Sequence, residues 1–269
     1  MRSLAMKIAS LIAAIPALAM ADVSVVRGLP YRTGSADKAS CACVLDLQTP
    51  HGVTGFPTVV WLHGGGLVNG SRHFIRINES IAQVAVEYRL MKEGGLSDGE
   101  VCIDDAAAAT AWALSHIAEY GGDPKRVYLS GMSAGGYLTM MVGMAPKYLA
   151  KYGFRTTDLA GLAPVSGQAT KHFNVRKFAG DVDPQYLPKI DSLAPLAWVG
   201  KDLPPIVSIC GQPPREWPCR SEENKLLIAS CTALGHKQAR YVEMPFCDHG
   251  CAYTAGVPYV EMFVEGRLP

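Results

Sequence analysis

Apolar residues along the chain follow two patterns, and each predicts strands of a different kind. Residues 23–26 and 43–47 alternate weakly between apolar and polar side chains, which indicates antiparallel strands with one solvent-facing side. Apolar runs without alternation predict strands buried on both faces at residues 57–62, 81–88, 159–164 and 205–210. Shorter strands are expected at residues 126–130 and 240–244. The pattern predicts two leading antiparallel strands followed by a mostly parallel sheet.

Helical segments are predicted between these strands. Asp104 and Asp105 open an alanine-rich stretch that reaches Tyr120. We expect this acidic pair to cap the helix, because negative charge in a first turn complements the helix dipole. Two further helices are expected at residues 135–144 and 221–234. Strands that alternate with helices imply right-handed crossovers and an α/β fold, with a mostly parallel central sheet flanked by helices.

The length and charge of the chain limit the possible classes of protein. Its 269 residues, 49% of them hydrophobic, suffice for one well-buried domain and not comfortably for two. The formal net charge is +1, without a basic stripe or an acidic tail. Neither nucleic acid nor an anionic membrane surface is therefore indicated as a partner. The sequence leaves the oligomeric state open.

The first 21 residues have the composition of a targeting segment. Arg2 and Lys7 give a positive start, residues 8–18 are an apolar run too short to span a bilayer, and residues 19–21 (AMA) match an A-x-A cleavage site. A buried N-terminal helix is the alternative. We expect residues 1–21 to be a cleaved signal peptide and the mature protein to be secreted or periplasmic.

Export would give some of the eight cysteines a structural role, because disulfides persist in oxidising compartments. Cys219, Cys247 and Cys251 fall in loops that we expect to lie close together. We expect a bridge among these three, and a bond from Cys219 to Cys247 or to Cys251 is one hypothesis for its pairing. The cysteines in apolar stretches are expected to be buried thiols: Cys102, Cys210 and Cys231. Neither a C-x-x-C pair nor clustered histidines indicate a zinc site.

Two glycine-containing motifs carry the chemistry. Residues 131–135 (GMSAG) fit G-x-S-x-G, in which a serine sits on a strained turn between a strand and a helix and the glycines let the backbone bend. Residues 63–66 (HGGG) fit a loop that turns backbone N–H groups toward the oxygen of a bound ester. A serine that only completes a tight glycine turn is the alternative for Ser133. The two motifs, in this order and spacing, predict a serine hydrolase with Ser133 as its nucleophile.

With several further segments, these motifs give the chain a resemblance to the α/β-hydrolase superfamily. It looks most similar to the carboxylesterase branch, which includes hormone-sensitive-lipase-like, feruloyl and acetyl-xylan esterases. The segments that carry the superfamily resemblance are 61–66 (WLHGGG), 86–90 (VEYRL), 119–124 (EYGGDP) and 130–136 (SGMSAGG). Those similar to feruloyl esterases in particular are 166–168 (SGQ), 171–173 (KHF) and 222–224 (EEN). The resemblance implies a single catalytic α/β-hydrolase domain over residues 22–269. It also implies that the short insertion at 167–200, after the sixth strand, stands where such folds often carry a lid.

In this superfamily the serine comes first along the chain, then an acid, then a histidine, so the base is expected late. His249 follows the last predicted strand, in a loop at its carboxyl end, and we expect it to accept the proton of Ser133. His236 is also late, but it follows a helix end, where we expect it to neutralise the helix dipole or to face solvent.

The acid departs from the family pattern. Where the family typically has a carboxylate three residues after the glycine that ends the preceding strand, this chain has Pro214. In the resembling subgroup a second acid often stands five residues after that glycine, and Glu216 matches it. Glu216 is therefore the expected partner of His249. The alternative is a solvated Glu216 paired with a neighbouring arginine. Asp248 is the less suitable substitute, because neighbours in a chain rarely aim their side chains at each other.

The oxyanion hole is expected to use backbone N–H groups of Ala134, Gly65 and Gly66. A side chain at these glycines would block the close approach of the substrate carbonyl. We expect His63 to hold the shape of the loop rather than to transfer protons. This chemistry requires no metal and no organic cofactor.

Together these expectations describe a secreted carboxylic ester hydrolase that works through an acyl-enzyme. The subgroup resemblance implies short acyl or feruloyl esters of plant polysaccharides, so the partner is a small-molecule or polysaccharide-linked ester. A serine peptidase of the same fold is one alternative, although such peptidases usually carry a propeller domain, for which we expect no segment here. An inactive binding homologue is the other, and the departure at Pro214 is the feature that favours it.

Overall fold

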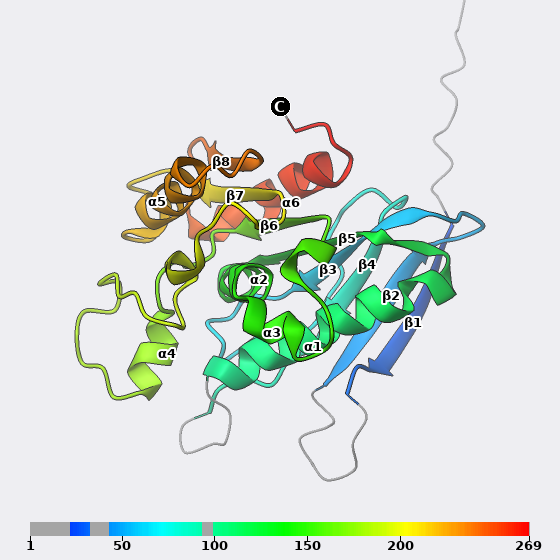
Figure 1. The fold of residues 1–269 in the computed structure, drawn as a ribbon, viewed down its shortest axis with the longest axis horizontal. Helices are drawn as coiled ribbons and strands as arrows, with labels where there is room; N and C mark the ends of the chain where they lie inside the picture. Colours follow the sequence, from blue (N-terminus) through cyan, green and yellow to red (C-terminus); the bar gives the residue numbers. More distant parts are fainter. Residues whose placement is uncertain (1–21, 33–42, 93–98, 269) are drawn as a thin grey trace, which may run out of the picture.

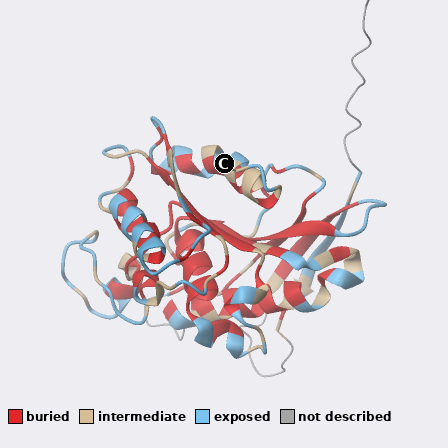
Figure 2. Cartoon of the chain, turned by 45° about the horizontal axis from the view of Figure 1, so that its top comes forward, coloured by how far each residue is buried: buried red, intermediate tan, exposed pale blue. Residues whose placement is uncertain are grey.

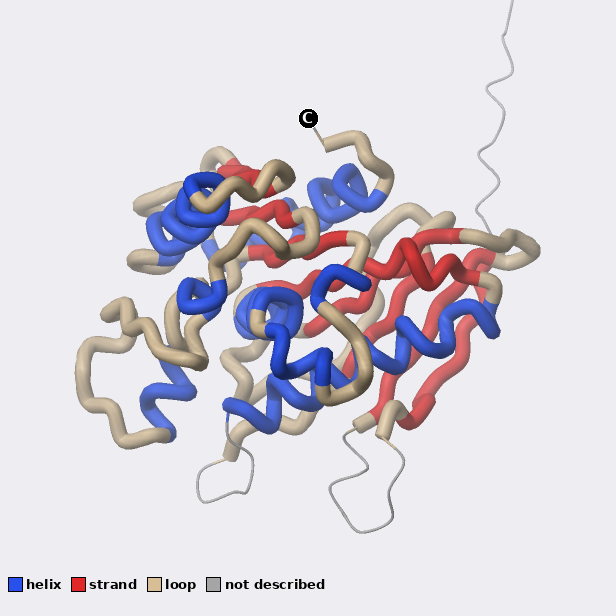
Figure 3. The backbone as a smooth tube through the Cα atoms, in the orientation of Figure 1, coloured by secondary structure: helices blue, strands red, loops and turns tan. Residues whose placement is uncertain are grey.

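The structure is a computed structural model that describes residues 22–32, 43–92 and 99–268. The expected signal peptide lies outside the described residues. The described chain forms three layers, a twisted sheet with helices on both faces (Figure 1, Figure 3). The expectation of an α/β fold built on a mostly parallel central sheet is confirmed.

Within the described ranges the sheet has eight strands in the order β1-β2-β4-β3-β5-β6-β7-β8. Their bounds are β1 (Val23–Pro30), β2 (Val44–Pro50), β3 (Phe56–Leu62), β4 (Ala82–Val86), β5 (Gly122–Met132), β6 (Gly161–Val165), β7 (Ile206–Gly211) and β8 (Ala239–Met244). Strand β2 runs antiparallel to both β1 and β4, and the other neighbouring strands are parallel. The two leading antiparallel strands are therefore confirmed.

The central strands are buried on both faces, as their continuous apolar runs predict. Every residue of β3, β4, β6 and β7 is buried. Successive side chains of a strand point to opposite faces, so Val60 and Leu62 of β3 join one hydrophobic cluster and Val59 and Trp61 join the other. Figure 2 shows the sheet as a buried band between helices whose outer sides are exposed.

The helices divide between these two clusters. The bounds are α1 (Gly99–His116), α2 (Ala134–Met144), α3 (Pro146–Ala150), α4 (Phe173–Phe178), α5 (Arg220–Ala233) and α6 (His249–Val264). Short 3₁₀ helices are η2 (Ile117–Tyr120), η3 (Thr156–Asp158) and η4 (Pro195–Trp198). Helices α1, α2, α3 and α5 pack on one side of the sheet, and α6 packs on the other.

Two sequence-based expectations about helices are wrong. Helix α1 already includes Gly99, so Asp104 and Asp105 lie inside it and do not cap it. Asp105 is fully buried and forms ion pairs with Arg89 at 2.8 Å and Arg32 at 2.9 Å, because a buried carboxylate needs charged partners. Helix α6 was not expected, and it begins at His249, which sequence reasoning placed in a loop.

The insertion at 167–200 follows β6 as expected, and it contains α4 and η4. Its arginine Arg176 is almost fully buried, pairs with Asp181 at 2.8 Å, and donates to the carbonyl oxygen of Leu187 at 2.6 Å. These bonds fold the segment back on itself beside α4. The carboxyl ends of β3 and of β5 to β8 point to the same edge of the sheet, because these strands are parallel, and the insertion starts at that edge.

Candidate active site

Ser133 lies on the turn between β5 and α2, with φ 57° and ψ −113°, which is a strained backbone for a residue with a side chain. Its N–H donates to the carbonyl oxygen of Val165 at 2.8 Å, which fixes the turn against β6. The flanking glycines leave no room for a side chain. A Cβ atom on Gly131 would lie 2.6 Å from the backbone of Gly135 and of Leu62, and one on Gly135 would overlap the carbonyl oxygen of Leu62.

The structure brings three of the expected residues into one chain of hydrogen bonds. Nε2 of His249 lies 2.9 Å from Oγ of Ser133, and Nδ1 of His249 lies 2.7 Å from Oε1 of Glu216. All three side chains are buried. They come from the turn after β5, the loop after β7 and the first residue of α6 after β8. A proton on Nδ1 facing the carboxylate leaves Nε2 free to accept the serine proton.

Glu216 is held as a carboxylate by several donors. Oε2 accepts from Oγ of Ser166 at 2.7 Å and from the N–H of Gly211 at 3.2 Å, and Oε1 accepts from the N–H of Trp217 at 2.8 Å. Burial by itself would raise the pKa of Glu216, but the hydrogen bond and attraction to His249, with the Ser166 bond, outweigh it and lower the pKa to about 2. The alternative of a solvated Glu216 paired with an arginine does not match this geometry.

In the glycine loop after β3, two carbonyl groups are hydrogen-bonded within the loop, and these bonds set the direction of the next two N–H groups. Nδ1 of His63 donates to the carbonyl oxygen of Gly64 at 2.7 Å. The carbonyl oxygen of Gly65 accepts from the N–H groups of Val68 and Asn69, at 3.1 and 2.9 Å. In a trans peptide the N–H points opposite to the C=O, so these bonds aim the N–H groups of Gly65 and Gly66 the other way. Neither amide donates a backbone hydrogen bond within the described residues.

Gly65 has φ 109°, and a Cβ there would overlap the carbonyl oxygen of Asn69, so the loop requires glycine at this position. Ala134 begins α2, where the first N–H groups of a helix have no partner inside it. Among the described residues, the backbone N–H groups of the expected oxyanion donors Gly65, Gly66 and Ala134 thus have no helical or loop acceptor. Their position next to Ser133 fits an anion-binding role, because a Cβ on Gly64 would lie 3.6 Å from that of Ser133.

Comparisons with known proteins agree with this fold. The BD-FAE family model matches residues 45–152. Carboxylesterase 1F of Mus musculus is 36% identical over 127 residues, which is 43% of this chain and 22% of that protein. A truncated carbohydrate esterase from gut microbiota has a TM-score of 0.72 at 18% identity, over 94% of this chain and 98% of its own. An esterase of Thermogutta terrifontis with bound propionate has a TM-score of 0.67 at 20% identity, over 93% of this chain and 96% of its own.

The chain has the α/β-hydrolase fold of these structures, and its residues 45–152 are similar to the BD-FAE family. Its sequence similarity is to the carboxylesterase branch, which confirms the resemblance that the motifs indicate. The alignments span about a fifth to a quarter of the first curated relatives, at 22%, 23% and 19% of their lengths.

His63 supports the glycine loop in the way expected. Its ring stacks on that of Tyr88 with centroids 4.2 Å apart, and the Tyr88 hydroxyl donates to the His63 carbonyl oxygen at 2.9 Å. Burial lowers the pKa of His63, which favours the neutral ring with its proton on Nδ1. His236, in contrast, does not face solvent. It is buried, with Nε2 lying 3.0 Å from the carbonyl oxygen of Leu203.

Three residues that sequence reasoning did not assign to the site lie against its predicted members. Ser166 has φ 44° and binds Glu216, and the ring of Trp217 stacks on that of His249 with centroids 3.6 Å apart and an angle of 15°. Asn174 of α4 donates to the carbonyl oxygen of Gly66. Ser166 belongs to the SGQ segment that resembles feruloyl esterases, which was a usable signal. Trp217 and Asn174 gave none, because their roles depend on contacts across the fold.

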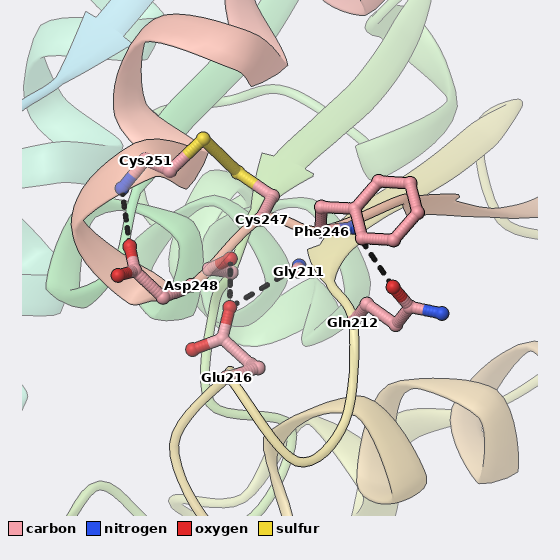
Figure 4. Close-up of a disulfide and its surroundings, with 8 residues drawn as sticks. Gly211, Gln212, Glu216, Phe246, Cys247, Asp248 and Cys251 are labelled. Carbon is pink, nitrogen blue, oxygen red and sulfur yellow. Dashed lines mark hydrogen bonds between the residues drawn. A yellow bond between two sulfur atoms is a disulfide. The ribbon is translucent and has the colours of Figure 1, made fainter.

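The expected bridge among Cys219, Cys247 and Cys251 is confirmed, but its pairing differs from the one suggested. Cys247 bonds to Cys251 across the start of α6 (Figure 4), whereas Cys219 carries no disulfide. The bridge brackets His249. The Asp248 side chain accepts from the N–H of Cys251 at 2.7 Å and so caps the helix, as Figure 4 shows. Asp248 is therefore engaged away from the imidazole.

Within the described ranges, no group of three or more histidine, cysteine or acidic side chains is arranged to hold a metal ion. None of the described helices is both long and apolar enough to cross a membrane.

Proposed function

We propose that this chain is a carboxylic ester hydrolase that works through an acyl-enzyme, with Ser133, His249 and Glu216 as its catalytic residues. The observation that carries the proposal is the hydrogen-bond chain from Oγ of Ser133 through His249 to Glu216, next to amides without acceptors. The curated relatives of the carboxylesterase branch support the same chemistry.

In the proposed reaction His249 Nε2 takes the proton of Ser133 as Oγ attacks the ester carbonyl. The oxyanion that forms accepts hydrogen bonds from the N–H groups of Gly65, Gly66 and Ala134. Each such donor typically contributes about 10²–10³ in rate. His249 then protonates the departing alkoxide, which leaves as the alcohol. The acyl group stays bonded to Oγ of Ser133. Glu216 keeps Nδ1 protonated and stabilises the imidazolium throughout.

Water completes the cycle by the same route. His249 Nε2 takes a proton from the attacking water, and the second tetrahedral intermediate collapses to release the carboxylic acid and restore the Ser133 hydroxyl. The ring of Trp217 covers one face of the imidazole, which limits the access of solvent to it from that side. The deep burial of Glu216 strengthens its interaction with the imidazolium.

We extend the proposal to short acyl or feruloyl esters of plant polysaccharides, offered as small molecules or on the polymer. The support is an aromatic wall made by Phe173, Tyr186 and Trp217. Ring centroids are 6.1 Å apart between Phe173 and Trp217 and 5.7 Å apart between Tyr186 and Trp217. The wall adjoins the face of His249, where an aromatic acyl or alcohol group of the substrate can pack edge-to-face or offset-stacked.

Kinetic assays test both levels of the proposal. Purified protein is assayed on p-nitrophenyl acetate, butyrate and octanoate, on methyl ferulate and on a peptide anilide, beside Ser133→Ala. We expect hydrolysis of the short esters and of methyl ferulate that Ser133→Ala abolishes. The absence of any ester hydrolysis that depends on Ser133 would remove the ester hydrolase proposal. Cleavage of the anilide alone would replace it with a peptidase, and activity on p-nitrophenyl octanoate but not on methyl ferulate would remove the feruloyl extension.

We also propose that residues 1–21 are a cleaved leader and that the protein is exported. The disulfide between Cys247 and Cys251 supports an oxidising compartment. N-terminal sequencing of protein recovered from the medium or periplasm should begin at Asp22. Recovery of full-length protein from the reducing cytoplasm alone would contradict export.

A further inference from the structure

The insertion between β6 and β7 contacts the glycine loop through the side chain of Asn174. Nδ2 of Asn174, in the first turn of α4, donates to the carbonyl oxygen of Gly66 at 2.6 Å. The two residues are 108 positions apart in the sequence. Contact is close, since a Cβ added to Gly66 would lie 3.0 Å from that nitrogen and 3.8 Å from the ring of Phe173.

Each of the three consecutive glycine carbonyls of the loop accepts a hydrogen bond, and that of Gly66 is the third. The carbonyl of Gly64 is bound by the ring of His63, and that of Gly65 by two amides from within the same loop. The carbonyl of Gly66 is bound by Asn174 instead. Gly66 has φ 65°, and glycine samples a wider range of backbone angles than any other residue. Its orientation therefore depends on an external partner more than that of a residue with a side chain would.

Asn174 is itself fixed by bonds around it. Its N–H donates to Nδ1 of His172 at 3.2 Å, and the N–H of Phe173 donates to Oε1 of Gln168 at 3.1 Å. Gln168 Nε2 in turn donates to Oγ1 of Thr170 at 3.2 Å. His172 and Gln168 are buried, so the start of α4 is attached to the body of the molecule. The amide of Asn174 is presented from a rigid support rather than from a free loop.

We propose that Asn174 is a positioning residue for the oxyanion hole. Its bond to the Gly66 carbonyl fixes the peptide between Gly66 and Leu67, and so anchors from the following side the residue whose N–H points at the oxygen that gains charge in the transition state. The inference rests on the proposed ester hydrolysis. The bond acts on the glycine loop and not on the substrate. Its loss therefore weakens transition-state binding while ground-state binding stays nearly unchanged, which predicts a fall in kcat without a matching rise in KM.

The test compares Asn174→Ala and Asn174→Asp with wild type and with Lys177→Ala, an exposed change on the same helix. For p-nitrophenyl acetate, kcat should fall about tenfold in Asn174→Ala while KM stays within about twofold, less than the loss of a donor itself. Asn174→Asp has the same size but puts a carboxylate against a carbonyl oxygen, so its kcat should fall further. Lys177→Ala should behave as wild type.

A second readout is the rate of inactivation by diethyl p-nitrophenyl phosphate, whose phosphoryl oxygen enters the oxyanion hole. This rate should fall by a similar factor in Asn174→Ala. Thermal melting is recorded for each variant, and Asn174→Asp, which preserves the packing, decides the matter if Asn174→Ala does not fold. If the wild type hydrolyses esters and the Asn174 variants keep its kcat, with or without a raised KM, the inference is overturned and the proposed function still stands. Failure of the wild type to hydrolyse any ester would instead remove the proposed function, and the inference with it.

Discussion

The two sides of the site are held in place in different ways. The glycine loop depends mainly on itself, because His63, Val68 and Asn69 supply the partners of its first two carbonyls. On the other side, His249 depends on Glu216, which in turn is held by Ser166 at the end of β6 and by the end of β7. One side is encoded in a short motif, whereas the other exists only once three distant segments have met.

The histidine side should give the largest loss when it is broken. Glu216→Gln keeps the size of the side chain but removes the charge that faces Nδ1 of His249. We expect kcat for p-nitrophenyl acetate to fall by about 10²–10⁴, because the ring loses its tautomer preference and its imidazolium loses its counter-charge.

The matched control for that change is Glu222→Gln, an exposed acid in the first turn of α5. It should retain wild-type kcat. A wild-type rate in Glu216→Gln would remove this residue from the proposed catalytic set and would leave Asp248 to be tested next.

Breaking the glycine side should cost somewhat less. In Gly65→Ala the new Cβ overlaps the carbonyl oxygen of Asn69, and the backbone at φ 109° is one that alanine avoids. The loop must shift, so we expect kcat to fall by about 10²–10³, as for the loss of one oxyanion donor. Gly153→Ala is the control, since its φ is also positive, at 84°, but nothing lies near its Cβ. Equal rates in the two variants would mean that the loop tolerates side chains.

The contrast between the glycine loop and the histidine side also explains which parts of the site can be predicted from the sequence. The motif at 63–66 and the serine turn were predicted correctly as local structure, because glycine spacing reports backbone angles directly. Glu216 was found only through a resemblance, since the position where the family has its acid is Pro214. Asn174 and Trp217 were missed, because no local pattern marks a residue whose partner is more than thirty positions away.

The fold shows the same division. Continuous apolar runs predicted the central strands because burial on both faces leaves a local signature. Asp105 misled the prediction, because an acidic residue near an expected helix start also suits a buried ion pair with Arg89 and Arg32. Helix α6 was missed, and it follows so closely on β8 that His249 was read as part of a loop.

Removing a support of Glu216 should have a smaller effect than removing Glu216. Ser166→Ala deletes the hydroxyl that donates to Oε2 at 2.7 Å, but the amides of Gly211 and Trp217 remain. We expect kcat to fall about tenfold, consistent with the loss of one hydrogen bond to a buried charge. Ser166→Gly relieves the strain of φ 44° and should show the same loss if the hydroxyl is responsible. Recovery of activity in the glycine variant would assign the effect to the backbone.

The smallest expected effect is on stability at low pH. The pKa of Glu216 in the folded protein is lowered to about 2 from its ordinary value of 4.5. Its ionised form therefore stabilises the fold above pH 4.5, and that contribution is lost as the pH falls from 4.5 toward 2. Urea unfolding of wild type and Glu216→Gln should show a free-energy difference that shrinks across this interval. A difference independent of pH would contradict the strong pairing of Glu216 with His249.

The measurement that tests the central claim most directly is mass mapping of an acyl-enzyme. Protein is mixed with p-nitrophenyl acetate, quenched with acid within the first turnovers and digested. In wild type, one acetyl group should be found on the peptide that contains Ser133, and none on that peptide in Ser133→Ala. An acetyl group on another residue, or ester hydrolysis that persists in Ser133→Ala, would contradict the proposal that both sides of the site act on Ser133.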